Sequence, residues 1–303
     1  MPNWNDVLSE IEGQNKGPHD LVRHQYLEKL YLHTNRNLLI YYSGWLQKPG
    51  GRVDFGINDA DTIGFMTCSH GVDRSKGLDL VLHTPGGDVA ATESIISYLH
   101  SLYDGNIRAI IPQMAMSGGT LIALSCKEIA MGRQSSLGPV DPQIGGMPAQ
   151  GILEEFNLAA EEIAKDPTRI HIWQPVIAKY WPTLITSCQH AIDWSDALLR
   201  DFLTKCMLKD DDEAARAEKI EKIANLLGKQ STSKSHNRHI SQDVATSLGL
   251  KVVRLEDDNT LQDLVLTLHH ALTITFARTN AVKIIENHKG VAYIQQMQTV
   301  KTA

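Results

Sequence analysis

Cysteine is scarce in this chain of 303 residues, and an excess of positive charge and long apolar runs are both lacking. The four cysteines stand apart, with no Cys-x-x-Cys pair, which argues against a zinc site and is typical of proteins from a reducing compartment. The formal net charge of −6 gives no support for nucleic-acid binding. The apolar tracts fall short of about 20 residues, so we expect no membrane span.

Targeting and metal-binding signals are also missing. The first 20 residues mix acids, glycine and proline where a secretory leader would carry an apolar stretch. The metal-site spacings His-x-x-x-His and His-Glu-x-x-His do not occur. We therefore expect a cytoplasmic protein that uses no metal or other cofactor.

The chain is long enough for a large core and a substantial appendage. Its composition predicts an N-terminal helical arm (1–36), a catalytic core (37–150), a helical extension (151–230) and a returning segment with a strand and C-terminal helices (231–303). Within the extension, Pro182 predicts a kink in a helical stretch from His171 to Leu208. The part from Thr260 onward is predicted to be helical.

Within the core, strand patterns alternate with helix patterns. The runs LDLVLH and NIRAII read as strands, and each leads through a glycine turn into a helix. Strand–turn–helix units in this order predict right-handed crossovers and a mainly parallel sheet of the α/β class. Ligands bind at the carboxyl ends of strands in such sheets, which is where both glycine turns are expected.

The two turns carry residues suited to acyl chemistry. The first is Pro85-Gly86-Gly87, and the second, Ser117-Gly118-Gly119, places a hydroxyl between a strand and the positive end of a helix. The amides of Gly87 and Gly118 are candidates for an oxyanion hole, because first-turn amides have no helical partner. The same amides also suit phosphate or acyl-carrier binding.

These segments resemble a known family. The stretch LVLHTPGGDVAA, the later Ser-Gly turn and the segment LGPVDP are similar to the core of Clp-class and signal-peptide-peptidase serine peptidases. The branch that matches best is the serine dehydrogenase proteinase branch, through Ser235-His236 with Ile240 and the Leu248–Val252 segment as well. The resemblance covers residues 37–145 well and 235–295 more loosely. It implies a Clp/crotonase-like fold with a helical C-terminal elaboration.

The resemblance also implies the catalytic residues. Ser117 would be the nucleophile, and the family's order of serine, aspartate and histidine nominates Asp141 and His236. The histidine that follows the serine closely in the Clp proteolytic subunit is absent here. A lysine base, as in the signal-peptide peptidases, is the alternative, with Lys165 the best-spaced candidate and Lys127 a poorer one.

Other readings remain open for several of these residues. His239 lies three residues from His236 and competes with it as base, and His83 stands directly before the first glycine turn. Asp141 precedes a proline and also suits a simple turn.

The resulting hypothesis is a serine peptidase that acts on peptides or proteins and forms a homo-oligomer. A crotonase-like acyl-thioester enzyme and a catalytically inactive scaffold are the alternatives.

Overall fold

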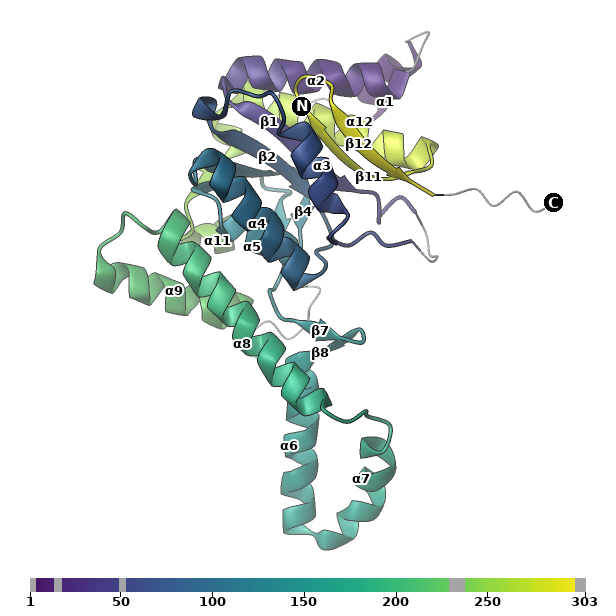
Figure 1. The fold of residues 1–303 in the computed structure, drawn as a ribbon, viewed down its shortest axis with the longest axis vertical. Helices are drawn as coiled ribbons and strands as arrows, with labels where there is room; N and C mark the ends of the chain where they lie inside the picture. The colour runs from purple at the N-terminus through teal and green to yellow at the C-terminus, as the bar shows by residue number, and fades with distance from the viewer. Residues whose placement is uncertain (1–3, 14–17, 49–52, 229–237, 298–303) are drawn as a thin grey trace, which may run out of the picture.

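A seven-stranded sheet forms the centre of the computed structural model, which describes residues 4–13, 18–48, 53–228 and 238–297 (Figure 1). The strand order is β10-β5-β3-β2-β1-β11-β12. Five neighbouring strands are parallel: β1 (Asn37–Ser43), β2 (Leu78–His83), β3 (Ile107–Ile111), β5 (Glu128–Met131) and β10 (Val252–Arg254). The prediction of a mainly parallel α/β sheet is confirmed.

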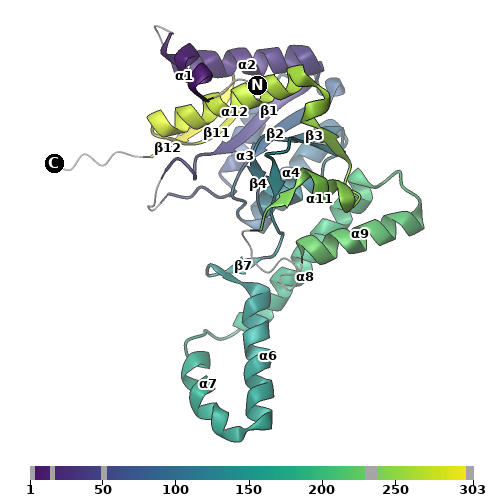
Figure 2. The ribbon, with the colours of Figure 1, turned by 180° about the vertical axis from the view of Figure 1, so that it is seen from behind.

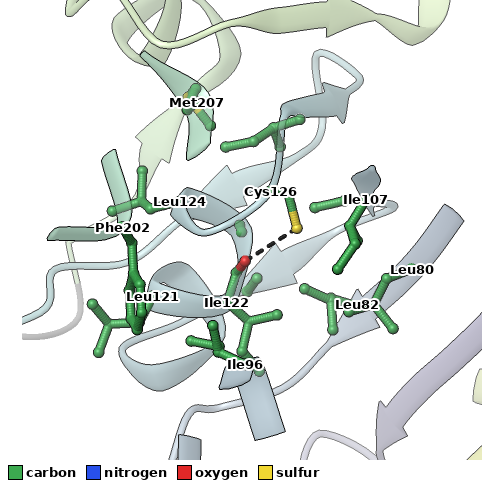
Figure 3. Packing of buried hydrophobic residues seen from close by; sticks show 14 of the residues in the cluster. Leu80, Leu82, Ile96, Ile107, Leu121, Ile122, Leu124, Cys126, Phe202 and Met207 are labelled. Atoms are coloured by element: carbon green, nitrogen blue, oxygen red, sulfur yellow. Dashed lines mark hydrogen bonds between the residues drawn. The ribbon is translucent and has the colours of Figure 1, made fainter. Parts of the chain in front are cut away.

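Helices cover both faces of this sheet (Figures 1 and 2). One face carries α3 (Asp61–Cys68), α4 (Val89–Tyr103) and α5 (Gly118–Leu124). The other carries α2 (Pro18–Thr34) and α12 (Asn259–Arg278), with α1 (Trp4–Glu12) packed on α12. Figure 3 shows the first face, where Leu121 and Ile122 of α5 pack against Leu82 of β2 and Phe202, the last residue of α8 (Leu184–Phe202). No described helix combines the length and apolar character that crossing a bilayer requires.

The predicted strand–turn–helix units are present, and a side-chain cap marks the helix start of the first unit. All six residues of β2 are buried, and the strand ends at the Pro-Gly-Gly turn. The Asp88 carboxylate then accepts a hydrogen bond of 2.8 Å from the Ala91 amide and caps α4. The glycine turn is therefore held between a buried strand and a capped helix.

A smaller sheet joins distant segments near the second glycine turn. It consists of β4 (Met114–Ala115), β6 (Ser136–Leu137) and β9 (Ile240–Ser241), with β6 parallel to β4 and antiparallel to β9. α11 (Gln242–Ser247) follows β9 directly. Through the pairing of β9 with β6, the part of the chain after the helical extension packs on the core again.

The helical extension projects from the core as an arm (Figure 1). After the hairpin β7 (Gln143–Ile144) and β8 (Met147–Pro148), its elements are α6 (Ala149–Lys165), α7 (Ile170–Ile177) and α8 (Leu184–Phe202), then the π-helical η3 (Leu203–Met207) and α9 (Glu213–Leu227). Short 3-10 helices are η1 (Arg74–Lys76), η2 (Pro167–Arg169) and η4 (Leu255–Asp257).

The predicted kink at Pro182 is a complete break. Residues 178–183 separate α7 from α8, and Thr183 adopts a left-handed φ of 70°. Proline lacks the amide that would continue the helix and disfavours helical backbone in the residue before it, here Trp181. The chain reverses at this point, so that α8 returns to the core.

The predicted helices at the C-terminus are partly wrong. From Thr260 to the last described residue, 297, helix is confined to α12, and β11 (Ala281–Asn287) and β12 (Ala292–Gln296) then form an antiparallel hairpin on the sheet. All seven residues of β11 are buried, including Lys283 and Glu286. Because polar residues occupy buried positions on both faces, the strand lacks the alternation that would have identified it.

Candidate active site

The two glycine turns meet at one edge of the sheet. Thr84, which follows β2, bridges to Ala115, with hydrogen bonds of 3.2 Å from the Thr84 amide to the Met114 carbonyl and 3.0 Å from the Met116 amide to the Thr84 carbonyl. A Cβ placed on Gly86 would lie only 2.6 Å from the Ser117 Cβ. The turns are thus in direct contact. This agrees with the prediction that both lie at the carboxyl ends of strands on one edge of the sheet.

The first turn requires glycine at both positions. Gly86 and Gly87 have φ values of 94° and 159°. Ile57 forms a bridge with Gly87: its amide donates to the Gly86 carbonyl at 2.7 Å, and its carbonyl accepts from the Asp88 amide at 2.8 Å. A Cβ on Gly87 would lie 2.1 Å from the Ile57 nitrogen, which leaves no room for a side chain.

Ser117 occupies a strained corner. Its φ of 49° and ψ of −114° lie outside the regions that non-glycine residues favour, and such strain is found at functional sites. Thr120 holds the corner, because its hydroxyl, with a single proton to donate, lies 2.8 and 2.9 Å from the carbonyl oxygens of Ala115 and Gly138. Among the described residues, the half-buried Ser117 hydroxyl has no hydrogen-bond partner.

Two backbone amides next to Ser117 are available to a ligand. The amides of Gly87 and Gly118 donate to no acceptor within the described part of the chain. They come from the two touching turns, since a Cβ on Gly118 would lie 3.5 Å from the Gly87 nitrogen. Paired amides of this kind can stabilise a negatively charged oxygen.

A cavity of about 350 Å³ opens beside the serine. Its lining comes from both turns, the segment after Asp141 and helix α8: Pro85, Gly87, Asp88, Val89, Ser117, Pro142, Gln143, Ala191 and Trp194. The volume lies within the range of small-ligand sites.

Asp141 lies next to this lining and is 2% exposed. The Gln143 side-chain amide donates to its carboxylate at 3.2 Å. The segment before it is anchored by hydrogen bonds from the Gly138 amide to the Ala115 carbonyl (3.1 Å) and from the Val140 amide to the Leu227 carbonyl (2.7 Å). The structure therefore brings Asp141 to the same edge as Ser117.

The candidate bases are placed differently. His236 lies outside the described residues. His239 is exposed, with its Nδ1 2.9 Å from the Ser136 hydroxyl. Lys165 is exposed at the far end of α6, a helix whose first residue donates its amide to the Pro142 carbonyl. Lys165 follows Ala149 by 16 positions in this 17-residue helix, and at about 1.5 Å per residue it lies about 24 Å along the helix, so the chain does not bring it to Ser117.

The remaining sequence candidates also lie away from the cavity. Lys127 is exposed and lines a separate cavity together with His100 and Cys206. His83 is fully buried against Trp45 and Tyr42, and burial lowers the pKa of its imidazole to about 3. In the described chain, no three His, Cys, Asp or Glu side chains gather closely enough to hold a metal ion.

Three residues of the site were not identified from the sequence. Ile57 flanks the first turn, and Ala191 and Trp194 line the cavity from α8. All three come from segments without a recognisable motif, because their position depends on contacts between parts of the chain that are far apart in sequence.

Comparison with known proteins gives the following matches. The sequence model of the family described as ClpP-like SDH-type serine proteinase matches residues 55–268. Two curated relatives come from Methanocaldococcus jannaschii. "Uncharacterized protein MJ0137" is 40% identical over 114 residues, 38% of this chain and 39% of that protein. "Uncharacterized protein MJ1495" is 45% identical over 89 residues, 29% of this chain and 30% of that protein. The chain thus spans less than two fifths of the length of these relatives.

Proposed function

Because the chain belongs to the ClpP-like SDH-type serine proteinase family, we propose that it is a peptidase whose nucleophile is Ser117. The observation that carries the proposal is the strained serine at the strand–helix corner, beside two unbonded amides and a cavity. Strain of this kind persists only where the surrounding structure enforces it, and here it exposes the hydroxyl to the cavity.

The proposed reaction is acyl transfer to Ser117 followed by hydrolysis. The hydroxyl oxygen attacks the carbonyl carbon of a peptide bond while a base takes its proton. The amides of Gly87 and Gly118 donate to the oxygen that becomes negative, and loss of one such donor typically costs about 10²–10³ in kcat. The amine leaves with the proton, and water then hydrolyses the acyl-enzyme by the same route.

We propose that His236 is the base and that the Asp141 carboxylate orients its imidazole. Ile240 pairs with Leu137 in an antiparallel register, so the described chain that leads back from Ile240 to Arg238 heads along the segment toward Asp141. His236 stands two positions before Arg238 in the sequence, and the family order of serine, aspartate and histidine nominates it together with Asp141. Lys165 and Lys127 have no comparable support, and His239 already contacts Ser136.

Labelling with a fluorophosphonate probe tests the nucleophile. We expect wild type and the exposed-serine control Ser101→Ala to be labelled and Ser117→Ala not to be. Labelling that persists in Ser117→Ala would refute the assignment. An unlabelled wild type that binds an acyl-CoA thioester would favour the acyl-thioester enzyme, and one that does neither would favour the inactive scaffold.

The labelling rate also tests the base. His236→Ala should slow labelling by about 10²–10⁴, the usual contribution of general-base catalysis, and Lys165→Ala should leave it unchanged. The reverse order would assign the base to the lysine.

We further propose that the protein acts on peptides or proteins as a homo-oligomer. The arm exposes large apolar side chains, each between 45% and 55% accessible: Leu158, Ile170, Ile172, Trp181 and Ile185. Apolar surface gathered on one projecting element is typical of an interface.

A further inference from the structure

A buried ion pair lies behind the first glycine turn. Lys283 of β11 and Asp61 at the start of α3 are 1% and 0% exposed. The Lys283 ammonium is 3.1 Å from both carboxylate oxygens. Asp61 also accepts hydrogen bonds from the Tyr41 hydroxyl at 2.7 Å and from the Asn58 amide at 3.1 Å. The pair thus joins two strands of the main sheet to the segment before α3.

This network holds two consecutive carbonyl groups. Lys283 donates its third hydrogen bond to the Gly56 carbonyl. Ser43, the cross-strand partner of Lys283, donates its hydroxyl to the Phe55 carbonyl at 2.7 Å. Residues 55 and 56 are therefore tied to the middle of the sheet through side chains from β1 and β11.

The same segment continues directly to the glycine turn. Ile57 follows Gly56 and is hydrogen-bonded on both sides to the turn, through the Gly86 carbonyl at 2.7 Å and the Asp88 amide at 2.8 Å. Gly56 itself packs on the turn, since a Cβ placed there would lie 3.3 Å from the Gly87 Cα. The direction of the Gly87 amide hence depends on a backbone segment that Lys283 and Ser43 hold.

A fully buried ion pair is seldom the most stabilising choice at such a position. Desolvation of both charges offsets most of their attraction, and apolar residues of similar volume often give equal stability. An apolar side chain, however, cannot donate a hydrogen bond to the Gly56 carbonyl. The ion pair therefore supplies a directional contact that packing alone does not.

We propose that Lys283, charge-balanced by Asp61, is a positioning residue that aims the Gly87 amide at the substrate oxygen. It acts through Gly56 and Ile57 and does not touch the substrate. Its catalytic consequence rests on the proposed function of Ser117, whereas the placement of the turn does not.

Three variants of the full chain test this role. Lys283→Met removes the donor, and Lys283→Gln retains a shorter one. Ile284→Ala serves as the destabilised control. It removes a buried side chain of the same strand, which packs in the core between the sheet and helices α2 and α12. If Lys283→Met does not fold, the comparison is made between Lys283→Gln and the control.

Hydrogen–deuterium exchange of peptides covering 55–61 and 84–90 measures the turn without reference to activity. We expect faster exchange in Lys283→Met, an intermediate rate in Lys283→Gln and no change in Ile284→Ala. Exchange that is unchanged in both lysine variants, or equally raised in the control, would overturn the inference whether or not Ser117 is catalytic.

Peptide hydrolysis and the affinity of a peptide boronate, which forms a tetrahedral anion on a serine, measure the consequence. We expect kcat to fall about 10–100-fold in Lys283→Met with KM within twofold, boronate affinity to fall in parallel, and partial recovery in Lys283→Gln. Altered exchange with unchanged kcat would refute the aiming of the amide. Altered exchange in the lysine variants, with a wild-type protein that neither hydrolyses peptide nor labels at Ser117, would support the positioning of the turn and refute the peptidase function.

Discussion

The backbone of Ser117 is strained, because its dihedral angles are unfavourable for a residue with a Cβ atom but accessible to glycine. A non-glycine residue with φ 49° and ψ −114° costs on the order of 1–3 kcal/mol. The neighbouring turn avoids the same cost by using glycine at positions 86 and 87. A serine at this corner therefore lowers stability, which is consistent with the catalytic role proposed for it above.

Ser117→Gly should be more stable than Ser117→Ala. Glycine relieves the strain but loses more chain entropy on folding, so we expect a net difference of about 1 kcal/mol in the free energy of unfolding. Urea denaturation of the two variants, both of which lack the hydroxyl, measures it. Equal stability would mean that the corner carries no strain.

At the scale of the secondary-structure elements, packing of β1 and α12 against the end of β2 buries the imidazole of His83 in the core. His83 ends β2 and packs edge-on against His269 of α12, with ring centroids 5.3 Å apart. Tyr42 of β1 and Trp45, which follows that strand, complete the cluster. Burial lowers the pKa of His83 to about 3 and the pKa of His269 well below its usual value, so both imidazoles are neutral in the folded protein near pH 7.

This cluster predicts loss of stability in acid. Below about pH 6.5 the unfolded chain protonates His83, whereas the folded protein does so only near pH 3. Stability contributed by His83 should thus fall by on the order of 1 kcal/mol per pH unit between about pH 6 and pH 4. His83→Leu should show a weaker decline in urea midpoint over this range than wild type. The exposed-histidine control His70→Leu should follow wild type, and a parallel decline in all three proteins would contradict the assignment.

At the scale of the whole molecule, the arm of α6, α7 and the start of α8 exposes a group of large apolar side chains. Its own core is small, formed by Ala149, Ile152, Leu184 and Cys188 with a few half-buried neighbours. Leu158 of α6 and Ile170 and Ile172 of α7 remain exposed to solvent. Burying them against a second copy would remove this exposure, and each large apolar side chain contributes about 1.5–3 kcal/mol when fully buried.

Charge placed on this surface should dissociate the assembly. We expect Ile172→Asp combined with Trp181→Asp to shift sedimentation velocity from an oligomer to a monomer. Leu32→Asp, at a more exposed leucine on α2 outside the arm, should not alter the oligomeric state. A wild-type protein that sediments as a monomer would refute the proposed homo-oligomer.

Much of the core and half of the site could be predicted from local patterns. The β2–turn–α4 unit and the meeting of Gly87 with Ser117 followed from strand and helix signals next to glycine. The hairpin of β11 and β12 could not be predicted, because its buried polar residues hide the alternation of a strand. The break at Pro182 was recognised only as a kink, since periodicity continues on both sides.

By itself, the sequence determined which groups follow the strands: two glycine turns, the hydroxyl of Ser117 between strand and helix, and backbone amides that the turns leave without a hydrogen-bond acceptor. These features are local, because a few adjacent residues set each backbone conformation. Only the tertiary structure decided what surrounds them, from the placement of Ile57 and Asp141 to the ion pair of Lys283 with Asp61. Lys283 and Asp61 are separated by 222 positions, and no local rule couples residues so distant until the sheet brings them within hydrogen-bonding range.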